Sequence, residues 1–420
     1  MEFEIELLGK PCGILKIANE RFAFRYLESY LAANEPPISV AMPLNEEGYS
    51  DERTFPFFEN LLPEGQIRQL MAEQLKTAPN NFSRLLESVG GDVAGAIRIL
   101  TKENLEARES REPEKLTRTR LGDILERIEV SPFRIDETQK PRLSLAGAQN
   151  KLPVIVKDGD VYLTHGQAST HIIKPPSKRF PHLVQNEYLC MRSARRAGID
   201  TANVSLMPYL DSHDEQHECL VIERYDREPG ENSIRRIHQE DICQVMSIPS
   251  AQKYAKDGGP GYQELFESVR KFTSPSAIYQ NEIIKRLLFN ILVGNNDAHA
   301  KNFSLLHTTT HIKLAPAYDI VNTEAYEELD SHFAMPIGQA TTKEEMNIEH
   351  LKSLEKQTQI KLSRQKKNLR SFIEHAFAAI EAETLALEEN SHPEIQRLLK
   401  PLRKGTSRNY EILLGLLRNL

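Results

Sequence analysis

Asp297 and Asn302 lie five residues apart in the stretch NNDAHAKNFSLL, which packs polar side chains directly after an apolar run ending at Gly294. A loop aspartate at this spacing can take or orient the proton of an attacking hydroxyl, while the asparagine helps to bind magnesium. The catalytic loop of protein kinases uses the same pair in this way. Loop Asp and Asn are also common turn-formers and helix caps, so each residue alone has a purely structural explanation.

A second metal ligand follows in the stretch IKLAPAYDIVN, where a β-type run ends at Asp319, seventeen residues after Asn302. Magnesium is usually bound by one or two carboxylates and leaves positions for phosphate oxygens. Asn302 and Asp319 are therefore a reasonable ligand pair.

Residues suited to ATP occur upstream, in the order that kinases use. STHIIKPP closes a β-type run with Lys174, and Glu187 in the next helix stands where a kinase keeps the acidic partner of such a lysine. In CLVIERYDREPG, the backbone of Glu223 to Tyr225 is suited to bind adenine, and Tyr225 to stack on it. A solvated lysine and a strand followed by a turn are the structural alternatives.

The stretch RLSLAGAQNKLPV places Ala146, Gly147 and Ala148 between strand-like flanks, where backbone amides can approach phosphates. Neither G-x-x-x-x-G-K-[ST] nor G-x-G-x-x-G occurs in the chain, so a P-loop and a dinucleotide-binding fold have no support. The order of phosphate loop, strand lysine, helix glutamate, connection, Asp-x4-Asn and Asp favours a kinase.

The elements that must position these residues follow from hydrophobic spacing. Residues 279–294 have apolar side chains on one helical face, and Gly294 stands where a C-terminal glycine belongs. Residues 141–228 alternate β-type runs with one helical stretch at 184–199, which predicts a sheet with a helix against it. The chain beyond Gln239 has mostly helical patterns.

The N-terminal part, to about residue 100, mixes strand-like runs with a helical segment at 57–76, and the polar segment 101–120 predicts a linker or exposed stretch. We therefore expect an α+β protein with three parts: residues 1–105 as an N-terminal subdomain, 106–228 as a sheet-containing lobe, and 229–420 as a helical lobe.

Composition limits the class of protein. The 420 residues are 40% hydrophobic and 27% charged, which is typical of soluble globular proteins, and no apolar run reaches the ~20 residues of a membrane helix. The start MEFEIELLGK lacks the features of a signal peptide, and four widely spaced cysteines favour free thiols, so we expect a cytoplasmic location without membrane contact. A net charge of -7 argues against direct coating of nucleic acid.

Several blocks together resemble the HipA family of bacterial toxin serine/threonine kinases. They occur in the order of that family: FFENLLPEG, SLAGAQNK, THIIKPP, VIERYDR, QEDICQ, KYAKDGGPG, NDAHAKNFS and PAYDI. The resemblance implies a two-lobed protein-kinase-like fold with an N-terminal α+β subdomain and a mostly helical C-terminal lobe. For KYAKDGGPG, at 253–261, the residues themselves predict only a glycine-rich turn.

The resemblance also implies roles for residues of this chain. Asp297 would be catalytic, Asn302 and Asp319 would bind Mg²⁺, Glu187 would orient Lys174, and Ser144 would be autophosphorylated, which ejects its loop and switches the enzyme off. The ATP-binding residues would be Ala146, Gly147, Ala148, Gln149, Asn150, Lys151, Lys174, Glu223, Arg224, Tyr225, His299, Ala300, Lys301, Asn302, Tyr318 and Asp319.

The implied partners are a HipB-like helix-turn-helix antitoxin, operator DNA bound through it, and a protein substrate, an aminoacyl-tRNA synthetase in the family. Two other functions stay open: a non-catalytic corepressor scaffold acting with a DNA-binding antitoxin, and a small-molecule kinase. The chain also departs from eukaryotic kinases, since it has no His-Arg-Asp and its loop histidine, His299, follows the aspartate.

Overall fold

The computed structural model describes residues 1–89, 92–101, 112–130, 149–230 and 234–420. The chain forms two compact units, each assembled from several segments. The first comprises Met1–Pro175, Ser205–Ser250 and Leu306–Thr310, and the second comprises Pro176–Val204, Ala251–Leu305 and His311–Leu420. The three-part division at residues 105 and 228 stays a prediction.

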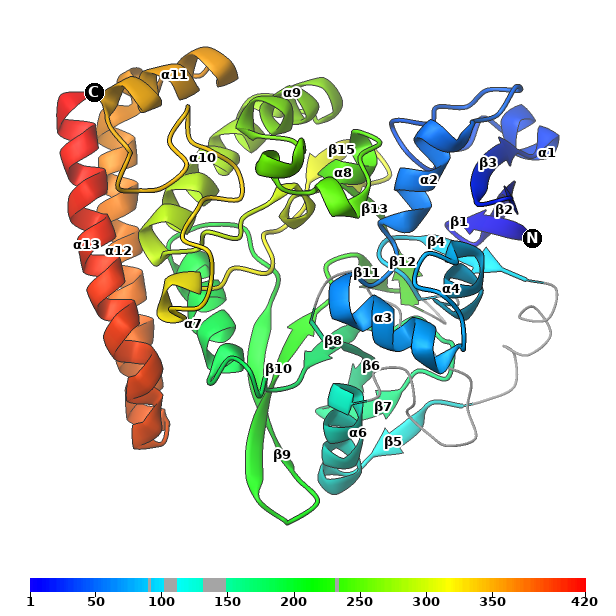
Figure 1. Ribbon diagram of the computed structural model, residues 1–420, viewed down its shortest axis with the longest axis horizontal. Helices are drawn as coiled ribbons and strands as arrows, with labels where there is room; N and C mark the ends of the chain where they lie inside the picture. The colour runs from blue at the N-terminus through cyan, green and yellow to red at the C-terminus, as the bar shows by residue number, and fades with distance from the viewer. Residues whose placement is uncertain (90–91, 102–111, 131–148, 231–233) are drawn as a thin grey trace. The chain divides into compact units, whose positions relative to one another are not determined.

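The first unit begins with an antiparallel four-stranded sheet in the order β3-β2-β1-β4 (Figure 1). Its strands alternate apolar and polar residues, so that Phe3, Ile5 and Leu7 of β1 all point into the core. The elements of this part are β1 (Glu2–Leu7), β2 (Lys10–Ala18), β3 (Arg21–Tyr26), α1 (Glu28–Ala32), α2 (Asp51–Glu59), α3 (Gly65–Gln74), α4 (Phe82–Val89) and β4 (Ile97–Leu100).

A second sheet in the same unit has six strands in the order β5-β7-β6-β8-β10-β9. Its elements and those that follow it are β5 (Glu114–Leu116), α6 (Arg118–Val130), β6 (Leu152–Lys157), β7 (Asp160–Leu163), β8 (His171–Lys174), β9 (Val204–Leu210), β10 (Gln216–Glu223), β11 (Arg227–Pro229), β12 (Ile234–Arg236), β13 (His238–Asp241) and α8 (Ile242–Val245). One hydrophobic core includes side chains from both sheets, among them Phe24, Ile99, Val154 and Ile173. The β-type runs predicted within residues 141–228 are confirmed by strands β6, β7, β8 and β10.

The second unit is mostly helical. Its long helices α12 and α13 lie side by side, with the rings of Phe377 and Tyr410 stacked at a centroid distance of 4.3 Å (Figure 1). The elements are α7 (Leu183–Arg196), η2 (Ala255–Asp257), α9 (Tyr262–Phe272), α10 (Ser276–Val293), η3 (Ala300–Asn302), β15 (Ile312–Leu314), η4 (Thr323–Ala325), α11 (Ile348–Thr358), η5 (Leu362–Gln365), α12 (Lys366–Asn390), η6 (Pro393–Ile395) and α13 (Gln396–Asn419). Strand β14 (Ser304–His307) begins in this unit and ends in the first. The short helix η1 (Ser250–Gln252) spans the boundary between the two units.

Two local expectations were wrong. The single helical segment expected at 57–76 is two helices, α2 and α3, because Pro63 between them lacks a backbone N–H and Gly65, the first residue of α3, adopts a left-handed φ of +53°. The described end of the polar segment, residues 112–120, is mostly exposed as expected, and it includes strand β5, which pairs with β7, and the start of α6. The β-type run before Asp319 ends earlier, at Leu314.

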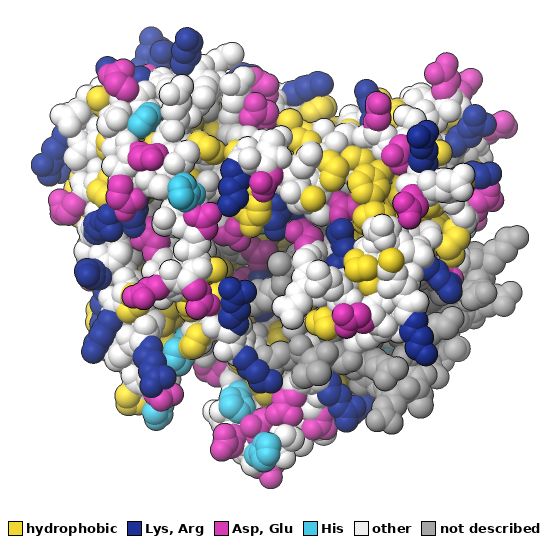
Figure 2. Space-filling view, viewed as in Figure 1, with side chains coloured by type: hydrophobic (Ala, Val, Ile, Leu, Met, Phe, Trp, Pro, Cys, Tyr) yellow, Lys and Arg dark blue, Asp and Glu magenta, His cyan; other side chains and the backbone are white. Residues whose placement is uncertain are grey.

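The α+β class is confirmed, because helices and strands both occur and the strands β3-β2-β1-β4 and β5-β7-β6-β8-β10 of the two larger sheets pair antiparallel. Within the described ranges, no helix combines the length and the apolar character needed to cross a membrane. On the face drawn in Figure 2, Lys and Arg side chains are interspersed with Asp and Glu rather than gathered in one basic field.

Candidate active site

The predicted catalytic loop begins at the C-terminal end of α10. Gly294 ends this helix in the left-handed conformation, with φ +76°, and its N–H bonds back to the helix carbonyls. The next residue continues this cap, because the Asn295 N–H donates to Asn290 O over 2.8 Å and its side-chain amide donates to Asn290 Oδ1 over 3.0 Å. The positive φ favours glycine here, and a Cβ at Gly294 would also come within 2.9 Å of the Glu324 side chain and displace it.

Asp297 is exposed between buried neighbours, which places its carboxylate at the surface of the loop. The Asp297 N–H donates to Asn295 Oδ1 over 3.1 Å. The Asn296 N–H donates to Thr323 Oγ1 over 2.9 Å, and this hydroxyl in turn donates to Gly294 O over 3.1 Å. The backbone on the N-terminal side of Asp297 is therefore held by neutral hydrogen bonds.

Tyr254 is a site residue that sequence reasoning missed. Its hydroxyl donates to Asp297 Oδ1 over 2.9 Å, and its ring meets the His299 ring edge-on at 5.3 Å. The Nζ atoms of Lys253 and Lys256 lie 5.3 and 5.8 Å from the centre of the same ring. The stretch KYAKDGGPG thus supplies a hydrogen-bond donor to the predicted catalytic carboxylate.

The glycines of that stretch make the approach of Tyr254 to the loop feasible. Gly258 ends η2 with φ +85°, and a Cβ at Gly259 would meet Gln252 O at 1.9 Å. No residue with a side chain fits at Gly259 without moving the backbone. The motif was visible in the sequence, but its partner, 43 positions away, was not.

The predicted metal residues lie on two segments of the second unit that are bonded to each other. Tyr318, next to Asp319, donates its hydroxyl to Lys301 O over 2.6 Å, directly before Asn302. The Asn302 amide nitrogen donates to Asp297 O over 3.5 Å, which leaves its amide oxygen as the atom suited to a metal. Asp319 has φ +54°, a left-handed conformation that is uncommon for a non-glycine residue and that occurs at functional turns.

The remaining loop residues are mostly interior. His299 is 7% exposed, Lys301 8% and Ala300 0%. The His299 N–H donates to Asp297 O over 2.9 Å, so the loop turns tightly around the carboxylate. Asp297 is thus the exposed candidate on these segments, and Asn302, Tyr318 and Asp319 are partly exposed.

Other predicted residues belong to the first unit. Lys174 ends β8 opposite Leu220 of β10 and is buried, with 3% exposure. Gln149, Asn150 and Lys151 lead into β6, whereas Ser144, Ala146, Gly147 and Ala148 lie outside the described residues. Glu187 lies on α7 of the second unit, where it is 1% exposed.

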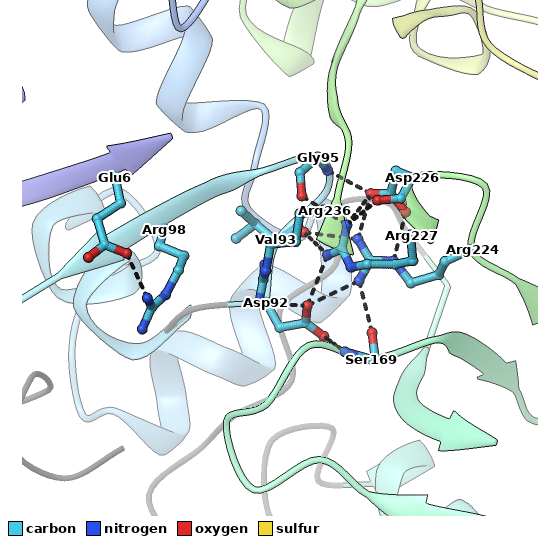
Figure 3. Close-up of polar contacts among 10 residues, drawn as sticks. All are labelled: Glu6, Asp92, Val93, Gly95, Arg98, Ser169, Arg224, Asp226, Arg227 and Arg236. Carbon is cyan, nitrogen blue, oxygen red and sulfur yellow. Dashed lines mark hydrogen bonds and ion pairs between the residues drawn. The ribbon is translucent and has the colours of Figure 1, made fainter. Parts of the chain in front are cut away.

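The connection after β10 is held by a buried ion cluster, which Figure 3 shows. Glu223 is exposed and Tyr225 half-buried, but the Arg224 side chain points into the unit. Its guanidinium bonds both carboxylate oxygens of Asp226, at 2.9 and 2.7 Å, and also the Ser169 hydroxyl and Val93 O. Its backbone N–H donates to Thr170 O over 2.9 Å. Arg224 is therefore anchored by both backbone and side chain.

Asp92, Arg227 and Arg236 complete this cluster. Asp92 forms ion pairs with Arg224 at 3.4 Å, Arg227 at 3.0 Å and Arg236 at 3.3 Å, and it accepts the Ser169 N–H. Asp226 also pairs with Arg227 and accepts the Gly95 N–H over 2.7 Å. Sequence reasoning did not find this cluster, because its acids and bases come from segments more than 120 residues apart.

The electrostatics of the cluster favour the ionised form of the Asp92 and Asp226 carboxylates, whose pKa values are lowered. Burial alone would raise the pKa of Asp226, but the Arg224 and Arg227 guanidiniums outweigh it and hold that pKa far below its usual range. Among the described residues, three guanidiniums here face two carboxylates. Burial, with repulsion from Arg227 and Arg224, accordingly lowers the pKa of Arg236 to about 9 despite the attraction of Asp92.

Comparison with known proteins agrees with this architecture. Residues 3–100 match the family described as HipA N-terminal domain, and residues 143–384 match the family described as HipA-like C-terminal domain. The Y4mE protein of Sinorhizobium fredii is 36% identical over 375 residues, covering 88% of this chain and 87% of the relative. The serine/threonine-protein kinase toxin HipA of Shewanella oneidensis is 32% identical over 76% of this chain and 74% of its own length.

A solved structure is similar over nearly the whole fold. A chain of the Shewanella oneidensis complex of HipA, HipB and operator DNA superposes with a TM-score of 0.84 at 27% identity, covering 99% of this chain and 98% of that chain. Both family matches, the relatives and the fold agree, and this chain belongs to the HipA family of kinases.

Proposed function

We propose that this chain is a toxin serine/threonine-protein kinase that transfers the γ-phosphate of ATP to a protein hydroxyl. The observation that carries the proposal is the exposed Asp297 carboxylate, held by the Tyr254 hydroxyl at 2.9 Å on a loop whose other end is bonded to the Asp319 segment. A carboxylate so placed can accept or orient the proton of an acceptor hydroxyl.

The residues present fit magnesium. The Asn302 amide oxygen and the Asp319 carboxylate are hard oxygen donors, and the Tyr318–Lys301 hydrogen bond ties their two segments together. Bound Mg²⁺ would supply charge neutralisation on the phosphates. The protein's own part is to hold these oxygens, and to orient Asp297 through Tyr254.

Three of the places assigned to ATP binding lie in the first unit, and the others, at 299–302 and 318–319, lie in the second. Lys174 would contact phosphates, the backbone of Glu223–Tyr225 would bind adenine, and Gln149–Lys151 would belong to the phosphate loop. The anchoring of Arg224 supports the second assignment, because a connection fixed through its buried side chain presents its backbone in one conformation.

Regulation and partners form the rest of the proposal. Phosphorylation of Ser144 would add about -1.5 to -2 charges next to the phosphate loop and so repel ATP. The similarity to a HipA bound to HipB and operator DNA supports a HipB-like antitoxin and DNA bound through it. The family resemblance alone supports an aminoacyl-tRNA synthetase as substrate, and a cytoplasmic site of action follows from these partners.

A non-catalytic corepressor is the second candidate, because the similar solved chain is part of an operator DNA complex. The two functions differ in one measurement. Phosphatase-treated protein is incubated with Mg²⁺ and radiolabelled ATP, and label on the protein itself or on lysate proteins is recorded. A scaffold would stay unlabelled, whereas a kinase would label itself or a lysate protein.

Asp297→Asn should lower labelling by about 10²- to 10⁴-fold without loss of folding, because the acceptor hydroxyl loses its base. The matched control is Asp214→Asn, the same change at an exposed left-handed residue that asparagine tolerates. Labelling that survives in Asp297→Asn would show that another residue is the base.

A further inference from the structure

Asn186 on α7 forms a paired hydrogen bond with the backbone of one distant residue. Its amide nitrogen donates to Asn322 O over 2.9 Å, and its amide oxygen accepts the Asn322 N–H over 2.9 Å. Asn186 is completely buried, and Asn322 lies three residues after Asp319. A side-chain amide in this orientation satisfies both backbone groups of Asn322. It thereby sets the position of α7 along its axis and its rotation relative to that segment.

The amide is otherwise well bonded, which fixes its orientation. The nitrogen also donates to the Tyr326 hydroxyl at 3.3 Å, and the oxygen accepts from Cys190 Sγ at 3.4 Å. Exchanging the amide oxygen and nitrogen would set donor against donor and acceptor against acceptor at Asn322. The side chain therefore has one favourable orientation.

The Asn322 segment passes this constraint to the catalytic loop. The Asn322 side chain caps η4 by accepting the Ala325 N–H over 2.8 Å. The following residue, Thr323, bonds Gly294 O and the Asn296 N–H, and Asn296 precedes Asp297. A continuous set of neutral hydrogen bonds thus runs from α7 past the Asp319 segment to the catalytic loop, all within the second unit.

We propose that Asn186 is a positioning residue for the magnesium site. It ties α7, which carries Glu187, to the segment that carries Asp319, so that the metal-binding carboxylate takes its place only when α7 is docked. The inference rests on the proposed kinase function and deepens it. Groups that orient metal ligands from behind commonly change metal affinity or activity 10- to 100-fold when removed.

The test is a Mg²⁺ titration of phosphotransfer at saturating ATP with purified full-length protein. Asn186→Asp keeps an acceptor for the Asn322 N–H but sets a carboxylate oxygen against Asn322 O. We expect the Mg²⁺ concentration for half-maximal activity to rise about 10-fold or more. The KM for ATP at saturating Mg²⁺ should change less than about 2-fold, because the predicted adenine contacts belong to the first unit.

Two further variants keep the result interpretable. Asn347→Asp makes the same change at an exposed helix N-cap, where aspartate serves equally well, and should leave the Mg²⁺ midpoint unchanged. If Asn186→Asp fails to fold, Asn186→Ser is used instead, because a serine side chain is too short to pair with Asn322. Stabilisation of each folded variant by Mg²⁺ and a non-hydrolysable ATP analogue, read as a thermal shift, gives a second measure of metal binding.

The outcomes separate the two proposals. If the wild-type protein is active and Asn186→Asp lowers the rate by the same factor at every Mg²⁺ concentration, the positioning role is overturned. The proposed kinase function is then retained. A wild-type protein that transfers no phosphate at any Mg²⁺ concentration would overturn both. A selective rise in the Mg²⁺ midpoint, matched by a smaller thermal shift, supports the role of Asn186.

Discussion

The Glu223–Tyr225 connection in the first unit is held by buried ions, whereas the Asn295–Asn302 loop in the second is held by neutral amides, hydroxyls and backbone groups. Arg224, Arg227 and Arg236 surround Asp92 and Asp226 in the first case. In the second case, the hydrogen bonds are formed by Thr323, by Asn290 of α10 and by Asn295 and Asn296 of the loop.

The two kinds of anchor differ in how much stability is lost when one partner is removed. Removing one partner of a buried ion pair leaves an uncompensated charge in the interior, which costs several kcal/mol. Removing one neutral hydrogen bond costs about 1 kcal/mol and is insensitive to salt. Changes at the connection should therefore act mainly on folding, and changes at the loop mainly on the geometry around Asp297.

The largest effect should come from Asp226→Asn, which leaves the buried guanidiniums of Arg224 and Arg227 facing one carboxylate instead of two. We expect the free energy of unfolding to fall by about 3–5 kcal/mol. Denaturant unfolding followed by circular dichroism measures it. A loss below about 1 kcal/mol would mean that the cluster is not the main anchor of the connection.

Acid should weaken the first unit through His238, which is buried against Ile38 O and the His307 ring. Burial, with His307, lowers the pKa of His238 from 6.5 to about 4. The unfolded chain therefore binds the proton first, so the stability contribution is complete above about pH 6.5 and is lost as pH falls toward 4.

Between pH 7 and 4.5 this contribution is about 2 kcal/mol. His238→Gln should flatten the dependence of unfolding free energy on pH in that window. The lowered carboxylate pKa values of Asp92 and Asp226 act at lower pH, since their contribution is complete above the usual carboxyl range and is lost as pH falls below it. An unchanged slope in the variant would assign the acid sensitivity to other groups.

Thr323→Val removes the hydroxyl that accepts the Asn296 N–H and donates to Gly294 O, at nearly constant volume. We expect a loss of about 1–2 kcal/mol in unfolding free energy. Phosphotransfer should fall by about 10-fold, because a small misplacement of a catalytic group is costly.

The matched control for this variant is Thr384→Val, which removes a buried hydroxyl bonded to Ile380 O within α12. It should lose comparable stability but retain phosphotransfer. Equal loss of activity in both variants would show that Thr323 acts only through overall stability.

The smallest effect should come from Glu6→Gln, whose partner Arg98 lies 2.6 Å away beside the ion cluster (Figure 3). The Arg98 side chain is 31% exposed, so water screens this pair. We expect the free energy of unfolding, measured with denaturant, to fall by less than about 1 kcal/mol. A loss as large as that of Asp226→Asn would remove the distinction between buried and partly exposed pairs.

Elements defined by local patterns were predictable. The spacing of apolar residues along α10, with Gly294 after them, predicted both the helix and the start of the loop that holds Asp297. The β-type runs of the larger sheet were also predicted, because alternation and turn residues act within a few positions. The break between α2 and α3 was missed, since Leu61 and Leu62 remain buried outside any helix and so mimic helical spacing.

Residues that act through distant partners were not predictable from one sequence. Tyr254 meets Asp297 across 43 positions, Arg227 meets Asp92 across 135, and Asn186 meets Asn322 across 136. Each of these residues is ordinary in its local context: a tyrosine before a short helical turn, an arginine at the start of a short strand and an asparagine in a helix. Their partners depend on how the chain packs.

By itself, the sequence determined the α+β class, the family resemblance and the order of Lys174, Glu187, Asp297, Asn302 and Asp319 along the chain, because these depend on local spacing and residue type. Only the tertiary structure decided which groups hold the predicted site in place. Hydrogen bonds and ion pairs require approach to about 3 Å, and that approach is set by packing of segments far apart in the chain.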